Sequence, residues 1–274
     1  MPKNAKQIFM KLSFKNIAAA AAAVLMAASC GVVSFTGRRQ MLMYSDSEIT
    51  ALSDQTYTEF MSEARVSTDA EATKMLKNVG ETMVSALESY MSKTGQEDAL
   101  SGLTWEFQLV DSAAVNAFCL PNGKIVFFEG ILQYADTPEY IAVVMGHEMA
   151  HAIAKHGNER MSQESAMNLV GSLASEVIGV TRGESAQRLF QSGFGLGAQV
   201  GVLLPYSRKH EYEADKIGMY IMDIAGYDVN AAPAFWEKML EGSTGSANDF
   251  LSTHPSDAKR IAALKEAIKT KPNF

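Results

Sequence analysis

The chain has 274 residues, of which 47% are hydrophobic and 20% are charged, and its formal net charge is −7. This length suits one large domain or two small ones, and the apolar fraction suffices for a substantial core. The acidic balance argues against nucleic acid as a partner and against charge-driven binding to an anionic membrane.

Residues 1–29 have the organisation of an export signal. A lysine-rich start precedes an Ala-rich apolar stretch of 12 residues, Ile17 to Ala28, which is too short to span a bilayer comfortably. Small residues directly before Cys30 resemble a bacterial lipobox, although Ala27 replaces the usual Leu. We expect cleavage before Cys30 and lipidation of that residue. An ordinary secretory signal or an uncleaved anchor helix is the alternative.

Export would leave a protein with 20 basic and 31 acidic residues and a net charge of −11, because residues 1–30 hold four lysines and no acid. We expect a lipid-anchored protein of the bacterial cell envelope. Gly31 stands where an Asp would suggest retention in the inner membrane, so the outer membrane is favoured. Once Cys30 is lipidated, Cys119 cannot form an internal disulfide, and its apolar neighbours predict a packed core thiol.

The mature chain is predicted to start with a lipidated tether, residues 30–45, followed by one domain over residues 46–274. Two amphipathic helices are expected at about 47–65 and 69–94, where apolar residues recur at helical spacing. These helices are scaffold by default.

Three short strands are expected next, at residues 103–111, 115–120 and 124–128, with an Asn-Gly turn before the last. A helix then begins at Thr137-Pro138-Glu139, which provide a cap, a first-turn proline and an acid near the positive end of the dipole. It should run to about Gly157. The fold class predicted is α+β and mainly α-helical, with a small antiparallel sheet before this helix.

Residues 162–204 form an apolar, Gly-rich stretch. Within it, Leu189 to Ser207 has no charge and is about long enough to span a membrane, but it contains several Gly, Gln and Ser residues. We favour a buried or lid-forming helix over a segment that enters the membrane.

The helix after the strands carries the sequence His-Glu-x-x-His. The spacing places His147 and His151 on one face, one turn apart, where both imidazoles can bind a single tetrahedral zinc ion. Glu148 can reach a metal-bound water and take its proton. Burying these groups without a metal costs several kcal/mol. We therefore predict one zinc ion per chain rather than a chance pair of core histidines.

A catalytic zinc site usually has three protein ligands and a water. Ala154 and Gly157 occupy the positions where a metzincin has Gly and His, which excludes that class. Glu211 and Asp215, four residues apart, offer a third ligand and an acceptor for the free N–H of a zinc-bound imidazole. Glu213 competes with Glu211 but lacks this spacing.

Two further histidines are assigned no role in the site. His156 is expected at the C-terminal end of its helix, interacting with the helix dipole, and His210 is expected on a solvated helix face.

Together these segments resemble gluzincin metallopeptidases, the family that includes HtpX-like proteases, the mitochondrial Oma-type protease and CAAX prenyl endopeptidases. The chain looks closest to a soluble, exported lipoprotein branch. The matching segments are Gly37-Arg38-Arg39-Gln40, Asn116 to Gly123, His147 to His151, Glu211 to Asp215, Ser252 to Pro255, and Arg260-Ile261.

The resemblance implies zinc on His147, His151 and Glu211, with Glu148 as general base and acid. It also implies a role for His254 near the metal, where this residue either stabilises the oxyanion or caps the open zinc position. A surface-loop histidine is the alternative.

The resemblance further implies that the strand near Asn116 and Ala117 binds an extended polypeptide by main-chain pairing. We expect an endopeptidase that degrades misfolded or stalled envelope proteins. A tethered chaperone or assembly factor with rare cleavage is the rival. A structural zinc protein is disfavoured, because structural sites use four closed ligands, usually with Cys. The sequence defines neither the oligomeric state nor the cleavage preference.

Overall fold

The computed structural model describes residues 30–174, 184, 187–188, 207–242, 248–254 and 258–274. The predicted export signal and residues 189–206 of the uncharged segment lie outside these ranges, so those two predictions stay open. Within the described ranges, no helix combines the length and apolarity needed to cross a membrane.

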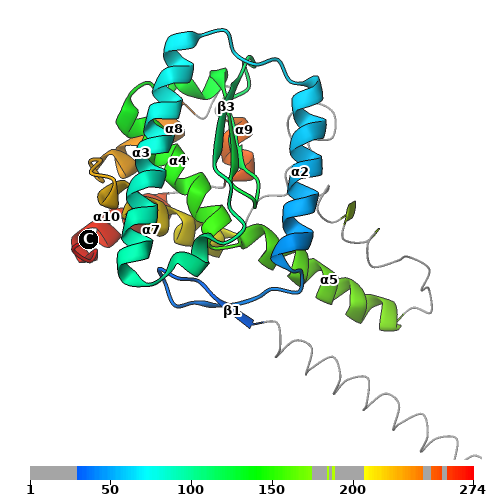
Figure 1. Ribbon diagram of the computed structural model, residues 1–274. Helices are drawn as coiled ribbons and strands as arrows, with labels where there is room; N and C mark the ends of the chain where they lie inside the picture. Colours follow the sequence, from blue (N-terminus) through cyan, green and yellow to red (C-terminus); the bar gives the residue numbers. More distant parts are fainter. Residues whose placement is uncertain (1–29, 175–183, 185–186, 189–206, 243–247, 255–257) are drawn as a thin grey trace, which may run out of the picture.

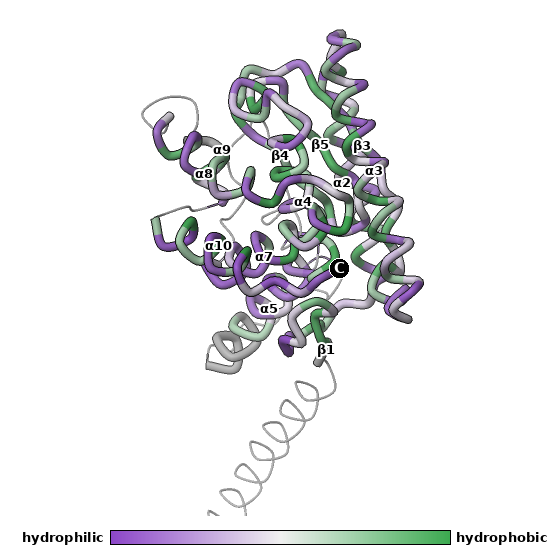
Figure 2. Tube along the Cα trace, turned by 90° about the vertical axis from the view of Figure 1, so that its left-hand side faces the viewer, coloured by the Kyte–Doolittle hydropathy of each residue, from purple (hydrophilic) through white to green (hydrophobic). Residues whose placement is uncertain are grey.

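Two long helices, α2 (Asp46–Glu63) and α3 (Ala70–Thr94), confirm the two expected amphipathic helices. A capping box between Ser45 and Glu48 starts α2, and Asp69 caps α3. Figure 1 shows them on opposite sides of the sheet, with α4 between them. In Figure 2, hydrophobic residues gather along the strands and α4, whereas hydrophilic residues recur along α2 and α3.

The three-stranded sheet consists of β3 (Glu106–Val110), β4 (Ala117–Cys119) and β5 (Lys124–Phe128), in the order β3-β5-β4. Strand β5 runs antiparallel to β4 but parallel to β3. The expected wholly antiparallel sheet is therefore wrong, although the α+β, mainly helical class is confirmed. Four of the five β5 residues are buried, and a continuous apolar strand of this kind favours the central position.

Helix α4 (Pro138–Ile153) carries the His-Glu-x-x-His motif and crosses α7 (Arg208–Ile224). The backbones meet at two glycines: a Cβ on Gly146 would lie 2.8 Å from Gly218 O, and a Cβ on Gly218 would lie 2.7 Å from Gly146 C. Because no side chain separates the helices at this point, His147 comes close to the first turn of α7.

Helix α4 ends at Ile153 rather than near Gly157, since Lys155 adopts a left-handed φ of 52° and turns the chain into α5 (His156–Ala174). The remaining described helices are α8 (Ala231–Glu241), α9 (Asn248–Thr253), α10 (Ala258–Thr270) and the 3-10 turns η1 (Glu97–Leu100) and η2 (Glu129–Gln133).

Residues 30–41 form a hairpin where a tether was expected. Strands β1 (Cys30–Val32) and β2 (Arg39–Met41) pair antiparallel. The turn between them is held because Gly37 takes a φ of 68° and donates its N–H to Val33 O at 2.8 Å. We call residues 30–41 the N-terminal hairpin.

Candidate metal centre

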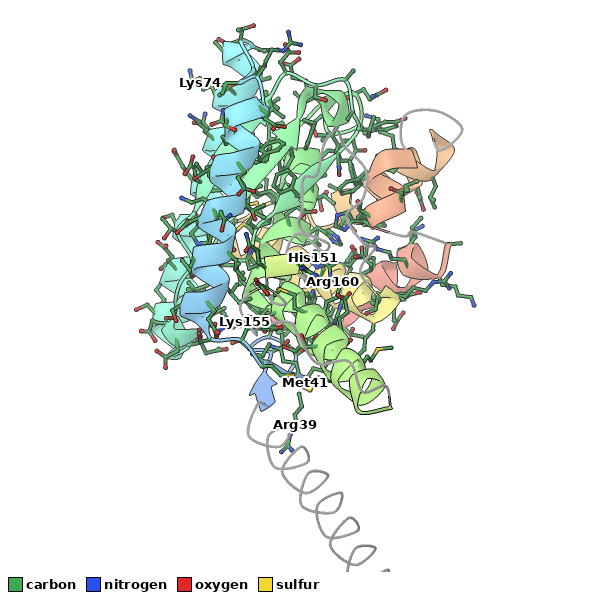
Figure 3. All side chains as sticks on the ribbon, turned by 90° about the vertical axis from the view of Figure 1, so that its right-hand side faces the viewer. Arg39, Met41, Lys74, His151, Lys155 and Arg160 are labelled. Atoms are coloured by element: carbon green, nitrogen blue, oxygen red, sulfur yellow. The ribbon has the colours of Figure 1, made fainter. Side chains whose placement is uncertain are left out.

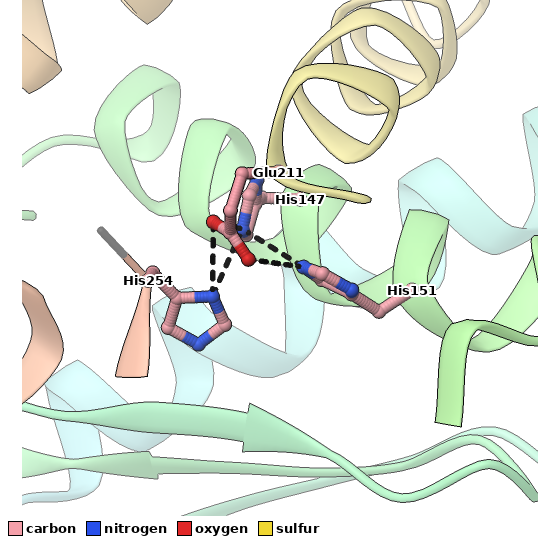
Figure 4. A group of neighbouring side chains, drawn as sticks. All are labelled: His147, His151, Glu211 and His254. Atoms are coloured by element: carbon pink, nitrogen blue, oxygen red, sulfur yellow. Dashed lines mark hydrogen bonds and ion pairs between the residues drawn. The ribbon is translucent and has the colours of Figure 1, made fainter. Parts of the chain in front are cut away.

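Four side chains from three parts of the chain converge on one point. His147 and His151 come from α4, Glu211 from the first turn of α7, and His254 from the residue after α9. Their donor atoms all lie within 4.8 Å of one another, and no side chain is more than 2% exposed. Figure 4 shows the Glu211 carboxylate between the three rings.

The donor atoms of this group lie close enough to one another to share one ion. The Nε2 atoms of His147 and His151 lie 3.1 Å apart. Glu211 Oε2 is 3.3 Å from His147 Nε2, and Oε1 is 3.5 Å from His151 Nε2. We call His147, His151 and Glu211 the donor triad.

The Glu211 carboxylate tests whether these residues fit a metal. It is buried, and neither oxygen accepts a hydrogen bond, although Arg260 Nη1 lies 2.9 Å from Oε2. Burial raises its pKa, but His254 and Arg260 outweigh burial and hold the pKa well below its ordinary value. Arg260 compensates Oε2, whereas Oε1 lies 3.5 Å from His151 Nε2 and accepts no hydrogen bond, so a metal ion at this point would satisfy it. Two imidazoles and one carboxylate form a donor set of catalytic zinc sites.

His151 also has the state that a metal ligand needs. Burial holds its pKa well below the ordinary value, so its ring is neutral at pH 7 and keeps a lone pair for a metal.

Glu148 lies beside the triad and is held from two sides. Its Oε2 accepts a hydrogen bond from Cys119 N at 3.0 Å, and its Oε1 lies 3.4 Å from His254 Nε2. Burial raises the pKa of Glu148 to about 7. A carboxylate with this pKa can both take and return a proton near neutral pH. Cys119 is buried, as predicted for a core thiol.

Asp215 lies where the sequence placed it, one helical turn after Glu211. Its Oδ1 is 3.1 Å from His147 Nδ1 and accepts a hydrogen bond from Arg260 Nη2 at 2.7 Å. Arg260 also lies over the Trp236 ring, with Cζ 3.8 Å from the ring centroid. In the sequence, Arg260 stands out only as part of a segment that resembles the family. Its place in a polar helix gives no local sign of complete burial.

His156 and His210 contradict the sequence expectations. His156 does not end α4; it begins α5 and is buried, with its Nδ1 3.0 Å from His151 Nδ1. His210 is also buried rather than solvated, and its Nε2 lies 3.0 Å from Glu159 Oε2. Both errors arise because the first turns of α5 and α7 lie side by side and exchange ion pairs, which no local pattern predicts. Figure 3 shows His151 in the interior of the domain, near the start of α5.

A second group of charges lies behind His151. Arg38 of the N-terminal hairpin donates to both Glu159 oxygens at 2.8 and 2.6 Å, and to Glu213 Oε2 at 2.6 Å. Burial raises the pKa values of both carboxyls, but their hydrogen bonds outweigh burial and hold each at about 2. Glu213 is thus directed into this network, whereas Glu211 faces the donor triad. The neighbouring Arg39 points away from the domain (Figure 3).

The edge of β4 that does not pair with β5 lies next to Glu148. Asn116 and Leu120 pair with β5 through their main chains, so Ala117 and Cys119 direct their N–H groups to the other side. The Asn116 side chain accepts the Ala117 N–H at 2.9 Å, and Glu148 accepts that of Cys119. Asn116 and Ala117 are both buried, so the substrate-binding role predicted for them concerns their main chain.

Comparison with known proteins agrees with this geometry. Residues 76–268 match peptidase family M48. The chain belongs to this family. The resemblance to Oma-type and HtpX-like gluzincins is thereby confirmed.

The chain is similar to proteins named as metalloendopeptidases and to one named as a protease. The mitochondrial metalloendopeptidase OMA1 of Schizosaccharomyces pombe is 40% identical over 169 residues, 61% of this chain and 48% of that protein. The OMA1 protein of Danio rerio is 31% identical over 284 residues, 98% of this chain and 58% of that protein. The beta-barrel assembly-enhancing protease of Escherichia coli is 28% identical over 174 residues, 61% of this chain and 35% of that protein. The chain thus spans about half, or less, of the length of these proteins.

Proposed function

We propose that this chain is a zinc-dependent endopeptidase, anchored through Cys30 in the bacterial cell envelope, that cleaves misfolded or stalled periplasmic and outer-membrane proteins. The observation that carries the activity is the buried donor triad with Glu148 beside it. The metalloendopeptidase names of the relatives support the activity, and the name of the Escherichia coli relative supports a role with envelope proteins.

His147, His151 and Glu211 would hold the zinc ion. When bound, zinc supplies Lewis acidity, which lowers the pKa of water and polarises a carbonyl group. An extended polypeptide would lie along the edge of β4 that does not pair with β5, and would pair with the main chain at Ala117 in place of the Asn116 side chain. Glu148 takes the proton of the attacking water and returns it to the leaving amine. The N–H of Cys119 keeps the Glu148 carboxylate in place for both transfers.

The replacement Glu148→Gln tests this function. An amide cannot move the proton, so we expect cleavage of an unfolded protein to fall by about 10²–10⁴-fold. Zinc content, measured by elemental analysis, should stay at one ion per chain. A chelator should stop the wild type, and Glu106→Gln on β3, the opposite sheet edge, should cleave normally. If Glu148→Gln cleaved the unfolded protein as fast as the wild type does, the proposed function would be wrong.

His254 is proposed to cap the metal at rest. Its Nδ1 lies 3.2 Å from His147 Nε2 and 3.4 Å from Glu211 Oε2, within the donor set, which favours capping over an oxyanion role. The replacement His254→Ala should therefore raise basal cleavage several-fold with zinc retained. A fall of about 10²–10³-fold would instead identify His254 as an oxyanion donor.

The rival function, a tethered chaperone or assembly factor, binds polypeptides on the same strand edge but needs no turnover. Complementation of a deletion strain with Glu148→Gln separates the two. Rescue by this variant would favour the chaperone, and failure to rescue at equal protein level would favour the peptidase.

A further inference from the structure

The two histidines of the donor triad have different supports. His147 directs its second ring nitrogen to a carboxylate, that of Asp215. His151 instead directs its Nδ1 to another imidazole, with His156 Nδ1 at 3.0 Å. The motif predicts no support for His151, and the two rings meet because the left-handed Lys155 ends one helix and His156 begins the next.

The direction of this hydrogen bond follows from the donor triad. If His151 binds a metal through Nε2, its neutral ring carries the proton on Nδ1. His151 Nδ1 must then donate, and His156 Nδ1 must accept. With its Nδ1 accepting, His156 carries its own proton on Nε2, the ring nitrogen that faces Glu213.

The next acceptor in line is Glu213. Its Oε2 lies 3.0 Å from His156 Nε2 and takes this second N–H. Two donors from the N-terminal hairpin hold the same carboxylate in place: Arg38 Nε lies 2.6 Å from Oε2, and the Thr36 hydroxyl donates to Oε1. These donors are 175 and 177 positions away in sequence.

We propose that His156, Glu213 and Arg38 are positioning residues for the metal ligand His151, linked to it by a chain of directed hydrogen bonds. This series of hydrogen bonds fixes the His151 tautomer and ring orientation. Through the His156 imidazole, the negative charge of Glu213 also polarises the His151 ring. Metal affinity thereby depends on the N-terminal hairpin, far from the motif in sequence. This inference rests on the proposed function, in that His151 must bind zinc.

Zinc affinity of the full chain measures the effect directly. We would titrate zinc in competition with a chromophoric chelator. His156→Phe keeps a ring of similar size but no acceptor, and it should weaken zinc binding about 10–100-fold, the range for losing a partner of a metal ligand. Glu213→Gln and Arg38→Met, which act one and two steps further away, should weaken it about 3–10-fold. Arg38→Lys should recover part of the loss.

Matched controls separate positioning from general damage. Arg39→Met alters the neighbouring exposed arginine, and Glu106→Gln alters a carboxylate that accepts from Lys124 at 2.9 Å on β3. Both should bind zinc like the wild type. In the cobalt-substituted protein, the visible absorption bands should shift in His156→Phe and Glu213→Gln but not in the controls. Unfolding of the chelator-treated proteins shows any loss of stability separately.

Nuclear magnetic resonance can test the tautomer itself. Long-range ¹H–¹⁵N correlation of the zinc-loaded wild type should show His151 protonated on Nδ1 and His156 on Nε2. The opposite tautomer of His156 would overturn the relay, as would wild-type zinc affinity and cobalt spectra in both His156→Phe and Glu213→Gln. Absence of zinc binding by the wild type would instead refute the proposed function.

Discussion

Two buried ion-pair networks flank the metal donors, and they come from opposite ends of the chain. His147 is supported by Asp215, which pairs with Arg260 of α10. His151 is supported through His156 by Glu213, which pairs with Arg38 of the N-terminal hairpin. The Arg260 side chain is 1% exposed and that of Arg38 is 14% exposed. We call them the C-terminal and N-terminal networks.

The comparison shows how one helix serves both ligands. Helix α7 carries Glu211, Glu213 and Asp215 within five residues. The first faces the triad, the second the N-terminal network, and the third the C-terminal network. The direct support of His147 is almost fully buried, with side-chain exposures of 1% for Arg260 and 3% for Asp215, while the support of His151 is one ring longer and nearer to solvent. Replacing a residue of one network should therefore change the free energy of unfolding by a different amount than replacing a residue of the other.

The largest effect is expected for Arg260→Leu. Loss of the guanidinium leaves Asp215 buried without its ion partner, which should lower the free energy of unfolding by about 3–5 kcal/mol. Denaturant unfolding of chelator-treated protein measures it. Lys265→Leu, on the same helix, breaks an exposed pair with Glu237 and should change stability by less than about 1 kcal/mol. Equal effects of the two replacements would contradict the contrast between buried and exposed pairs on α10.

A smaller effect is expected for Arg38→Met. It removes hydrogen bonds to Glu159 and Glu213, but these carboxylates are closer to solvent than Asp215 and water can replace part of the loss. We expect a destabilisation of about 1–3 kcal/mol in the same assay. Arg39→Met should stay within about 0.5 kcal/mol. If Arg38→Met destabilised as much as Arg260→Leu, the two networks would be equivalent.

The smallest effect on stability is expected for Glu159→Gln, and it depends on pH. Burial raises the pKa of this carboxyl, but His210 and Arg38 lower it to about 2, against about 4.3 when unfolded. A depressed folded pKa contributes stability above the unfolded pKa, which is lost as pH falls towards 2. The wild type should therefore exceed Glu159→Gln by roughly 1–2 kcal/mol at pH 7, and by progressively less between pH 5 and 2.

Unfolding of both proteins at pH 7, 5 and 3 tests this expectation. Glu81→Gln on the exposed face of α3 is the control, because its difference from the wild type should stay small at every pH. A Glu159→Gln difference that did not change with pH would show that Arg38 and His210 do not hold this carboxyl ionised.

The motif residues could be predicted because helical geometry is local. A spacing of four places His147 beside His151, and Glu211 one turn from Asp215, whatever surrounds them. Burial then argued for a metal. The order of the strands could not be predicted, because a turn joins β4 to β5 locally but nothing local states that β3 pairs with β5 in parallel.

The sequence by itself determined the reactive groups, the helix that presents them and the family. Tertiary structure decided the partners of those groups. His156, His210 and Arg38 are polar residues whose ordinary place is the surface. Here the two histidines are buried and Arg38 is half-buried, because the N-terminal hairpin and the first turns of α5 and α7 meet. The physical reason is that a buried polar group is tolerated where a hydrogen-bond partner is present. Each such partner lies 51 or more positions away in the chain.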